Sequence, residues 1–93
     1  METFELQFRE KIKKLTNSQQ SIESLSLWII YHSKFYKNSV KIWEEEIQKV
    51  SPSQQLTLLY VCNDVLQNSR KKTQNFINSF SDILPDVIEK IYT

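Results

Sequence analysis

The chain has 93 residues, of which 40% are apolar and 25% charged, a composition typical of one globular domain. Its formal net charge is only +1, so overall charge gives no reason to expect binding to nucleic acid or anionic lipid. It contains no glycine, which excludes the glycine-rich loops that hold nucleotide phosphates and argues against β-hairpins, so we expect an all-α fold.

The first predicted helix has one apolar face and a basic remainder. The apolar face consists of Phe4, Phe8, Ile12 and Leu15. The basic side chains are Arg9, Lys11, Lys13 and Lys14. With the neighbouring Phe8 they could touch RNA, but the low net charge and the lack of an evident stacking platform make RNA a secondary candidate partner.

The second predicted helix follows residues 16–18, a Thr-Asn-Ser segment that ends the first helix and supplies an N-cap. One arc of this helix carries Ile22, Leu25, Trp28, Ile29 and His32. Leu27 and Ile30 fall on the opposite side. A helix with apolar residues on two sides is expected to be central in the fold.

The third predicted helix follows a short connection over residues 34–38 and is expected to be capped by Asn38 or Ser39. Its apolar stripe consists of Val40, Trp43, Ile47 and Val50. Lys41, Glu45 and Lys49 follow one another at i, i+4 spacing on the other side. This pattern predicts a plain outer helix with a solvated charged face.

The fourth predicted helix has the clearest start, because Ser51 can cap it, Pro52 suits its first position and Gln54 suits a capping box. It is expected to run from about Pro52 to Ser69. Three cations that suit a helix C-terminus follow it.

The fifth predicted helix is capped by Thr73. Its apolar residues are Phe76, Phe80, Ile83, Leu84, Val87, Ile88 and Ile91. They keep one helical phase through Pro85, so we expect a kinked helix or two collinear pieces.

The fourth predicted helix also has two distinct faces. The core side consists of Leu58, Leu59, Cys62, Val65 and Leu66. The other side consists of Tyr60, Asn63, Asp64, Gln67 and Asn68. These are short or rigid side chains with defined donors and acceptors, which favours specific hydrogen bonding over simple solvation. Two interpretations stay open from the pattern alone, namely packing against a neighbouring helix and a binding groove.

Two segments of the chain resemble the RPR domain, also called the CTD-interaction domain (CID), and are most similar to its regulation-of-nuclear-pre-mRNA branch. The first segment is residues 15–28, which opens with Leu-Thr-Asn-Ser. The second is residues 56–72, which contains the run Leu-Tyr-x-x-Asn-Asp-Val-x-Gln-Asn-Ser. The resemblance covers nearly the whole chain, and the second run is fairly specific.

The resemblance implies an all-α right-handed superhelix similar to VHS and armadillo-type modules, here with about five helices. It also implies a nuclear, non-enzymatic binding module for the C-terminal tail of RNA polymerase II, with an adaptor role in transcription termination or RNA 3′-end processing. In the family, tail repeats of sequence Tyr-Ser-Pro-Thr-Ser-Pro-Ser form a β-turn in a groove along the second, fourth and seventh helices.

By the same resemblance, Asp64 would accept a hydrogen bond from the tyrosine hydroxyl of the peptide. The floor of the groove would be lined by Tyr60, Asn63 and Val65, and the peptide backbone would be bound by Gln67 and Asn68. The groove would be flanked by Asn17, Ser18 and Gln20 from the second helix.

The sequence departs from the family pattern at its C-terminal end. The family domain continues beyond the fifth helix, whereas this chain ends at Thr93, so we expect a domain over residues 1–93 that is shortened at its C-terminus. The arginine of the seventh helix that meets the phosphate on the second-position serine has no counterpart here. Arg70, Lys71 and Lys72 are the nearby candidates for that role, and the other interpretation is a solvated helix end.

That departure bears on assembly as well. The apolar face of the last helix is expected to lack part of its cover, and to pack against a second copy or a swapped element. The alternative function is then a helical structural or dimerisation module related to VHS domains, without tail binding.

Cys62, His32 and Asp64 do not suggest catalysis. Cys62 and Asp64 are two residues apart on a helix and so point about 200° away from each other. One cysteine and one histidine fall short of the usual zinc ligand sets, and no cofactor is implied. No signal peptide is visible and the longest apolar stretch, residues 25–31, is too short to span a bilayer, so we expect a soluble nuclear or cytosolic protein.

Overall fold

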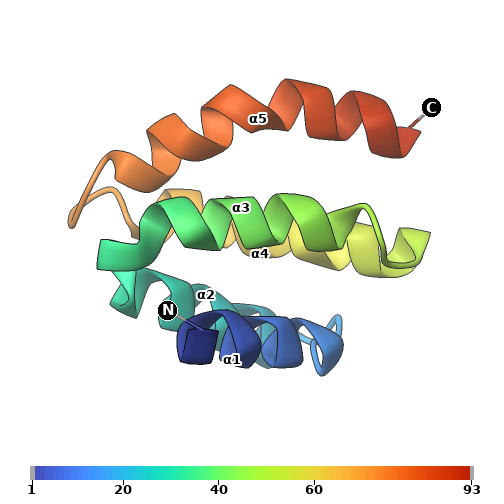
Figure 1. Ribbon diagram of the computed structural model, residues 1–93, viewed down its shortest axis with the longest axis horizontal. Coiled ribbons are helices and arrows are strands. Elements are labelled where there is room, and N and C mark those ends of the chain that lie inside the picture. Colours follow the sequence, from blue (N-terminus) through green and yellow to red (C-terminus); the bar gives the residue numbers. More distant parts are fainter. Residues whose placement is uncertain (1, 93) are drawn as a thin grey trace.

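The computed structural model describes residues 2–92, and within them every regular element is helical. The elements are α1 (Glu2–Lys13), α2 (Gln19–Tyr31), the 3₁₀ turn η1 (Ser33–Phe35), α3 (Tyr36–Ile47), α4 (Pro52–Asn68) and α5 (Asn75–Tyr92). They form three layers, in which α1 and α2 lie on one side of α3 and α4 while α5 covers the other side (Figure 1). The predicted all-α fold of five helices is confirmed.

Three of the predicted helix starts are confirmed by their capping bonds. Ser18 Oγ accepts from the Ser21 amide at 3.1 Å at the start of α2, and Ser51 Oγ accepts from the Gln54 amide at 3.3 Å at the start of α4. Thr73 Oγ1 accepts from the Asn75 amide at 3.1 Å before α5. These local contacts satisfy amide groups that the first turn of a helix leaves without partners.

The Gln54 side chain does not complete the capping box that the sequence predicts. Its amide nitrogen instead donates to the backbone carbonyls of Ile12 at 3.2 Å and Leu15 at 3.0 Å. These carbonyls belong to the end of α1 and the connection after it, where helix carbonyls lack intrahelical partners. Gln54 therefore joins the first turn of α4 to the region that leads into α2.

The start of α3 was predicted wrongly. The 3₁₀ turn η1 follows α2 directly, and α3 already begins at Tyr36, so Asn38 and Ser39 lie inside the helix instead of capping it. The N-cap residue is Phe35, which makes no side-chain capping bond. Ser39 is buried, because the helix turns this position toward the core.

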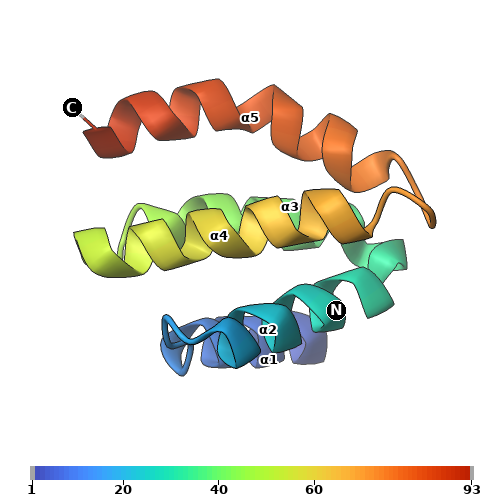
Figure 2. The ribbon, with the colours of Figure 1, turned by 180° about the vertical axis from the view of Figure 1, so that it is seen from behind.

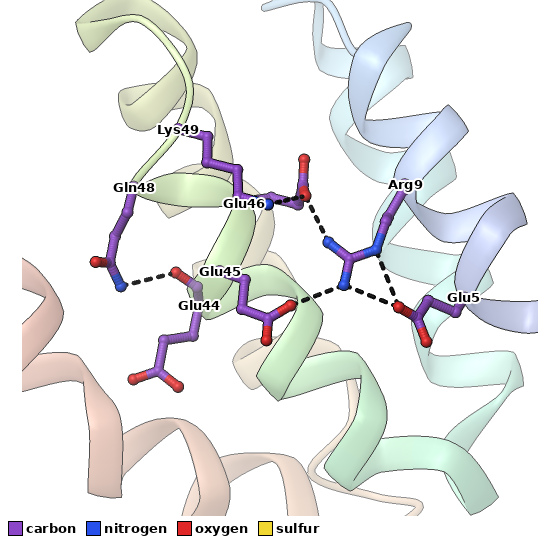
Figure 3. Close-up of polar contacts among 7 residues, drawn as sticks. All are labelled: Glu5, Arg9, Glu44, Glu45, Glu46, Gln48 and Lys49. Carbon is purple, nitrogen blue, oxygen red and sulfur yellow. Dashed lines mark hydrogen bonds and ion pairs between the residues drawn. The ribbon is translucent and has the colours of Figure 1, made fainter. Parts of the chain in front are cut away.

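The prediction of a plain outer helix for α3 is also wrong. This helix contacts α1, α4 and α5, and its Glu45 and Glu46 face Arg9 of α1 (Figure 3). Arg9 Nη2 lies 2.7 Å from Glu45 Oε1 and 2.9 Å from Glu5 Oε1, and Arg9 Nη1 lies 2.5 Å from Glu46 Oε2. Glu45 therefore forms an ion pair that joins α3 to α1, in addition to its place beside Lys41 and Lys49 on the charged side of α3.

The core runs through all three layers. Its fully buried large side chains include Phe8, Ile12, Ile29, Trp43, Ile47, Leu58, Phe76 and Phe80. The Trp43 indole nitrogen donates to the Leu58 carbonyl at 2.9 Å, and the ring meets Phe80 edge-on with centroids 5.1 Å apart. The two apolar sides predicted for α2 are only partly realised, because Ile30 is buried whereas Leu27 is exposed.

The last helix runs without interruption past Pro85, as one gently bowed helix (Figure 1). It buries Phe76, Phe80 and Val87 against the core. On its outer side Ile88 is 43% exposed, because within residues 2–92 no further layer covers α5.

Candidate peptide-binding site

The polar face belongs to α4, which lies between α2 and α5 and in front of α3 in the view of Figure 2. Tyr60 is 51% exposed, and Asn63, Gln67 and Asn68 are exposed as well. Asp64 is half-buried on the same face. The face is therefore open to solvent rather than packed against a neighbouring helix, which is the arrangement that a binding surface requires.

The polar groups of this face are available to a ligand. Within residues 2–92, the side chains of Tyr60, Asn63, Asp64 and Gln67 have no hydrogen-bond or ion-pair partner in the protein. Asn68 differs, because its amide nitrogen donates to the backbone carbonyl of Asp64 at 3.0 Å and leaves the side-chain oxygen free to accept. Ordered but unpaired donors and acceptors beside a phenol ring suit the recognition of a polar peptide with aromatic residues.

Val65 does not line the floor of the face as the resemblance implies. It is fully buried in the core together with Leu58 and Val61, because its position on α4 points inward. Its side chain therefore supports the face from below and has no surface that a bound peptide could touch in this structure.

The three residues expected from the start of α2 are not gathered on the polar face of α4, because Ser18 and Gln20 line a hollow with Lys11 and Lys14 instead. Asn17, Ser18 and Gln20 are exposed, and α2 runs parallel to α4 (Figure 2). The bond from Gln54 to the Leu15 carbonyl places the start of α2 beside the start of α4, away from Gln67 and Asn68. Ser18 is also committed to capping α2.

Two exposed side chains of α2 were not recognised from the sequence as surface residues. Leu27 is 61% exposed and Tyr31 is 78% exposed, and both lie on the helix that borders the α4 face. Leu27 was placed with Ile30 on a second apolar side of a central helix, and periodicity alone could not show that α2 leaves Leu27 exposed. Exposed apolar side chains on a helix that packs against α4 are further candidates for contact with a ligand.

The basic cluster lies just after the C-terminal end of α4, and its three side chains are exposed. Lys72 Nζ donates to the Ile30 carbonyl at 3.4 Å, so this lysine helps to close the C-terminal end of α2. Within the described part of the chain, the side chains of Arg70 and Lys71 make no such bond. They are the members of the cluster that remain open to an anion.

Cys62 and His32 are not arranged for catalysis. Burial raises the pKa of the Cys62 thiol to about 12, so the reactive thiolate is disfavoured near neutral pH. His32 Nδ1 lies 2.8 Å from the Trp28 carbonyl, and the ring packs on Phe4 and Trp28. Residues 2–92 contain no group of three or more His, Cys, Asp or Glu side chains that could hold a metal ion.

The all-helical fold and its open polar face are typical of an interaction module. The chain belongs to the CID domain family, which matches residues 6–93. It is 39% identical over 87 residues to human "Regulation of nuclear pre-mRNA domain-containing protein 1A" and 40% identical over 82 residues to the human protein 1B of that name. It is also 31% identical over 83 residues to "UPF0400 protein C337.03" of Schizosaccharomyces pombe.

These alignments cover 94%, 88% and 88% of this chain but only 28%, 25% and 21% of the three relatives. The chain thus spans about a quarter of the length of the curated relatives that it matches. The resemblance predicted from residues 15–28 and 56–72 is confirmed. None of the helices between residues 2 and 92 combines the length and apolar character that a membrane crossing needs.

Proposed function

We propose that this domain binds the heptad-repeat C-terminal tail of RNA polymerase II through the polar face of α4. The observation that carries the proposal is the open row of unpaired polar groups from Tyr60 to Gln67 in a chain of the CID family. The relatives are named for regulation involving nuclear pre-mRNA, which supports a nuclear adaptor role in transcription termination or RNA 3′-end processing.

The proposed contacts follow from the chemistry of the face. The half-buried Asp64 carboxylate is an acceptor for the tyrosine hydroxyl of a repeat, and a hydrogen bond to a charged acceptor is among the stronger ones. The Tyr60 ring, with Leu27 and Tyr31 from α2, offers apolar area to the prolines and tyrosine of the repeat. Gln67 and Asn63 are free to bond the peptide backbone.

The test is a calorimetric titration of a two-repeat Tyr-Ser-Pro-Thr-Ser-Pro-Ser peptide into wild type, Asp64→Ala and the matched control Asp82→Ala. Asp82 is an exposed aspartate of α5, so its removal makes the same change in charge outside the proposed site. We expect Asp64→Ala to raise Kd at least about tenfold, since a hydrogen bond to a charged group contributes roughly 1.5–3 kcal/mol. Asp82→Ala should bind like wild type.

The outcome that contradicts tail binding is the absence of saturable binding by wild type that circular dichroism shows to be folded. If Asp64→Ala and Asp82→Ala weaken peptide binding equally, Asp64 is not the residue that accepts the hydrogen bond from the tyrosine of the peptide. Tyr60→Phe, which keeps the ring and removes only the hydroxyl, should bind nearly as well as wild type if the ring supplies the contact.

Phosphate recognition is proposed for Arg70 and Lys71, the two cations at the end of α4 that stay open. We expect a peptide phosphorylated on the second-position serine to bind tighter than the plain peptide to wild type. That difference should shrink in the double variant Arg70→Gln/Lys71→Gln, whereas Lys41→Gln on α3 should keep it. A phosphate preference that the double variant retains would place the anion site elsewhere.

A second candidate function is self-assembly through α5. Its outer side exposes Ile88 to 43% and Tyr92 to 70%, while Leu84 and Ile91 are half-buried beside them. If two copies bury this side against each other, light scattering after size exclusion should give a dimer that Ile88→Glu converts to a monomer. A folded monomer at high concentration would count against assembly through this helix.

A further inference from the structure

A long hollow runs between α1 and α2, and Ser18 and Gln20 are the two of its lining residues that the resemblance assigned to peptide binding. It consists of two adjoining open cavities of about 500 Å³ and 400 Å³, and Lys11 and Lys14 line both of them. Trp28 lines the smaller cavity, and the larger one is lined by Leu15, Leu25 and polar residues including Ser24. An aromatic ring, two lysines and hydroxyl groups therefore share one depression.

Within residues 2–92, neither of the two lysines is held by a carboxylate, and Lys11 alone makes a ring contact, over Trp28. Both lysines are exposed. Lys11 Nζ lies 5.4 Å from the centroid of the Trp28 ring, within cation–π distance. Glu10 lines the smaller cavity, so the positive charge is strongest where Lys14 joins the two cavities.

Trp28 supplies the stacking platform that the sequence does not reveal. Its ring is only half-buried and is held in place by Phe4, which stacks on it with centroids 5.0 Å apart and planes 8° from parallel. The residues suggested by the sequence do not fill this role, because Phe8 is fully buried and Arg9 is paired with three glutamates. Lys11 lies over the ring, so a base that stacks on Trp28 takes the place of the Lys11 ammonium and leaves it beside the adjacent phosphate.

We propose that the hollow between α1 and α2 binds single-stranded RNA, with a base on Trp28 and the adjacent phosphates on Lys11 and Lys14. Duplexes are unsuited to it, because a base must be unstacked from its neighbours before it can stack on the Trp28 indole. The exposed Ser24 hydroxyl in the same hollow is an available partner for a ribose 2′-hydroxyl, which favours RNA over DNA. The proposal does not depend on tail binding by α4.

The experiment measures fluorescence anisotropy of a short fluorescein-labelled single-stranded oligoadenylate at several salt concentrations. Each phosphate contact on single-stranded nucleic acid contributes about 0.7 to the slope of log Kd against log salt concentration. We therefore expect Lys11→Gln and Lys14→Gln each to lower that slope by about 0.7 and to weaken binding. Lys13→Gln is the matched control, because Lys13 is an exposed lysine of the same helix that does not line the hollow.

A second readout reports on the base itself. Trp28 and Trp43 are the two tryptophans, and Trp43 is fully buried, so a base that stacks in the hollow should quench only the emission of Trp28. We expect RNA to quench wild type and Lys13→Gln, and to leave the remaining emission of Trp28→Phe unchanged. The Phe variant keeps an aromatic ring against Phe4, and its melting curve checks that it folds.

Several outcomes would overturn the proposal. The first is an absence of RNA binding by folded wild type, and the second is a salt slope that Lys13→Gln lowers as much as Lys14→Gln does. Equal affinity for the DNA oligomer of the same sequence would overturn the assignment to RNA. Tight binding of a phosphoserine peptide that Lys14→Gln abolishes, without RNA binding, would assign the hollow to phosphopeptides. Asp64→Ala should leave RNA binding unchanged, which separates this test from that of the α4 face.

Discussion

Arg9 shows how much the role of one side chain depends on its neighbours. In the sequence it belongs to a row of basic residues on the first helix, and although Glu5 lies four residues before it, nothing local indicates a contact with Glu45 or Glu46. In the structure its guanidinium binds Glu5 of its own helix together with Glu45 and Glu46 of α3 (Figure 3). A planar group with five donors can serve several carboxylates at once, which a lysine cannot do with the same geometry.

This network makes a prediction about pH. The hydrogen bond from Arg9 lowers the pKa of Glu45 below its ordinary value, so the folded state holds this carboxylate ionised at a pH where the unfolded chain takes up a proton. The stabilisation is therefore fully present above the unfolded pKa of about 4.3 and is lost as pH falls through the lower folded value. Arg9→Met should remove this component, which urea titrations at pH 7 and at acid pH can measure.

The control for this prediction is Lys13→Met, which removes a cation from the same helix without breaking an ion pair. We expect Arg9→Met to lower the free energy of unfolding at pH 7 by about 1 kcal/mol, because partly exposed pairs contribute roughly 0.2–1 kcal/mol each. Parallel acid dependence of wild type and Arg9→Met would contradict the assigned role of the pair.

At the scale of the elements, the helix starts that have a capping side chain were predicted correctly, whereas the neighbours of each helix in the fold were not. The caps of α2, α4 and α5 were predicted from Ser18, Ser51 and Thr73 because a side-chain oxygen and the amides after it are close in sequence. The start of α3 was missed because η1 extends the helical path from α2 without any capping side chain. The surroundings of α3 were missed because Arg9 and α5 are distant in sequence.

Gln54 gives a prediction at this scale. Its side-chain amide donates to the backbone carbonyls of Ile12 and Leu15. Gln54→Ala should lower the free energy of unfolding by about 1–3 kcal/mol, because both hydrogen bonds are lost. Gln7→Ala is the matched control, since Gln7 is an exposed helical glutamine. Chemical denaturation measures both, and equal small losses would show that Gln54 does not anchor α4 to α1.

At the scale of the whole molecule, Trp43 connects the middle layer to the outer helix. The side chain comes from α3, donates to a carbonyl of α4 and meets Phe80 of α5 edge-on. Because it is fully buried, its indole would lose a hydrogen bond with water if the Leu58 carbonyl were not there to accept. One residue therefore couples three helices of the fold.

Trp43→Phe should for this reason destabilise the entire domain. The bond from the indole to the Leu58 carbonyl is lost and a small cavity remains, which together cost about 2–4 kcal/mol. We expect the melting temperature to fall by roughly 8 °C or more while the unfolding transition stays cooperative. Tyr92→Phe, at an exposed position, should melt like wild type, and a Trp43→Phe variant with unchanged melting would show that the bond carries no net stability.

The sequence by itself determined the helical class, four of the five helix positions and the polar face of α4. Apolar periodicity and capping act over a few residues, so they can be read along the chain. Only the tertiary structure decided which surfaces are covered. It buries Val65 and exposes Leu27. It also pairs Arg9 with Glu45 and places Trp28 in the wall of a hollow. Burial depends on helices far apart in sequence, because a helix can hide a face only against a partner that the fold brings to it.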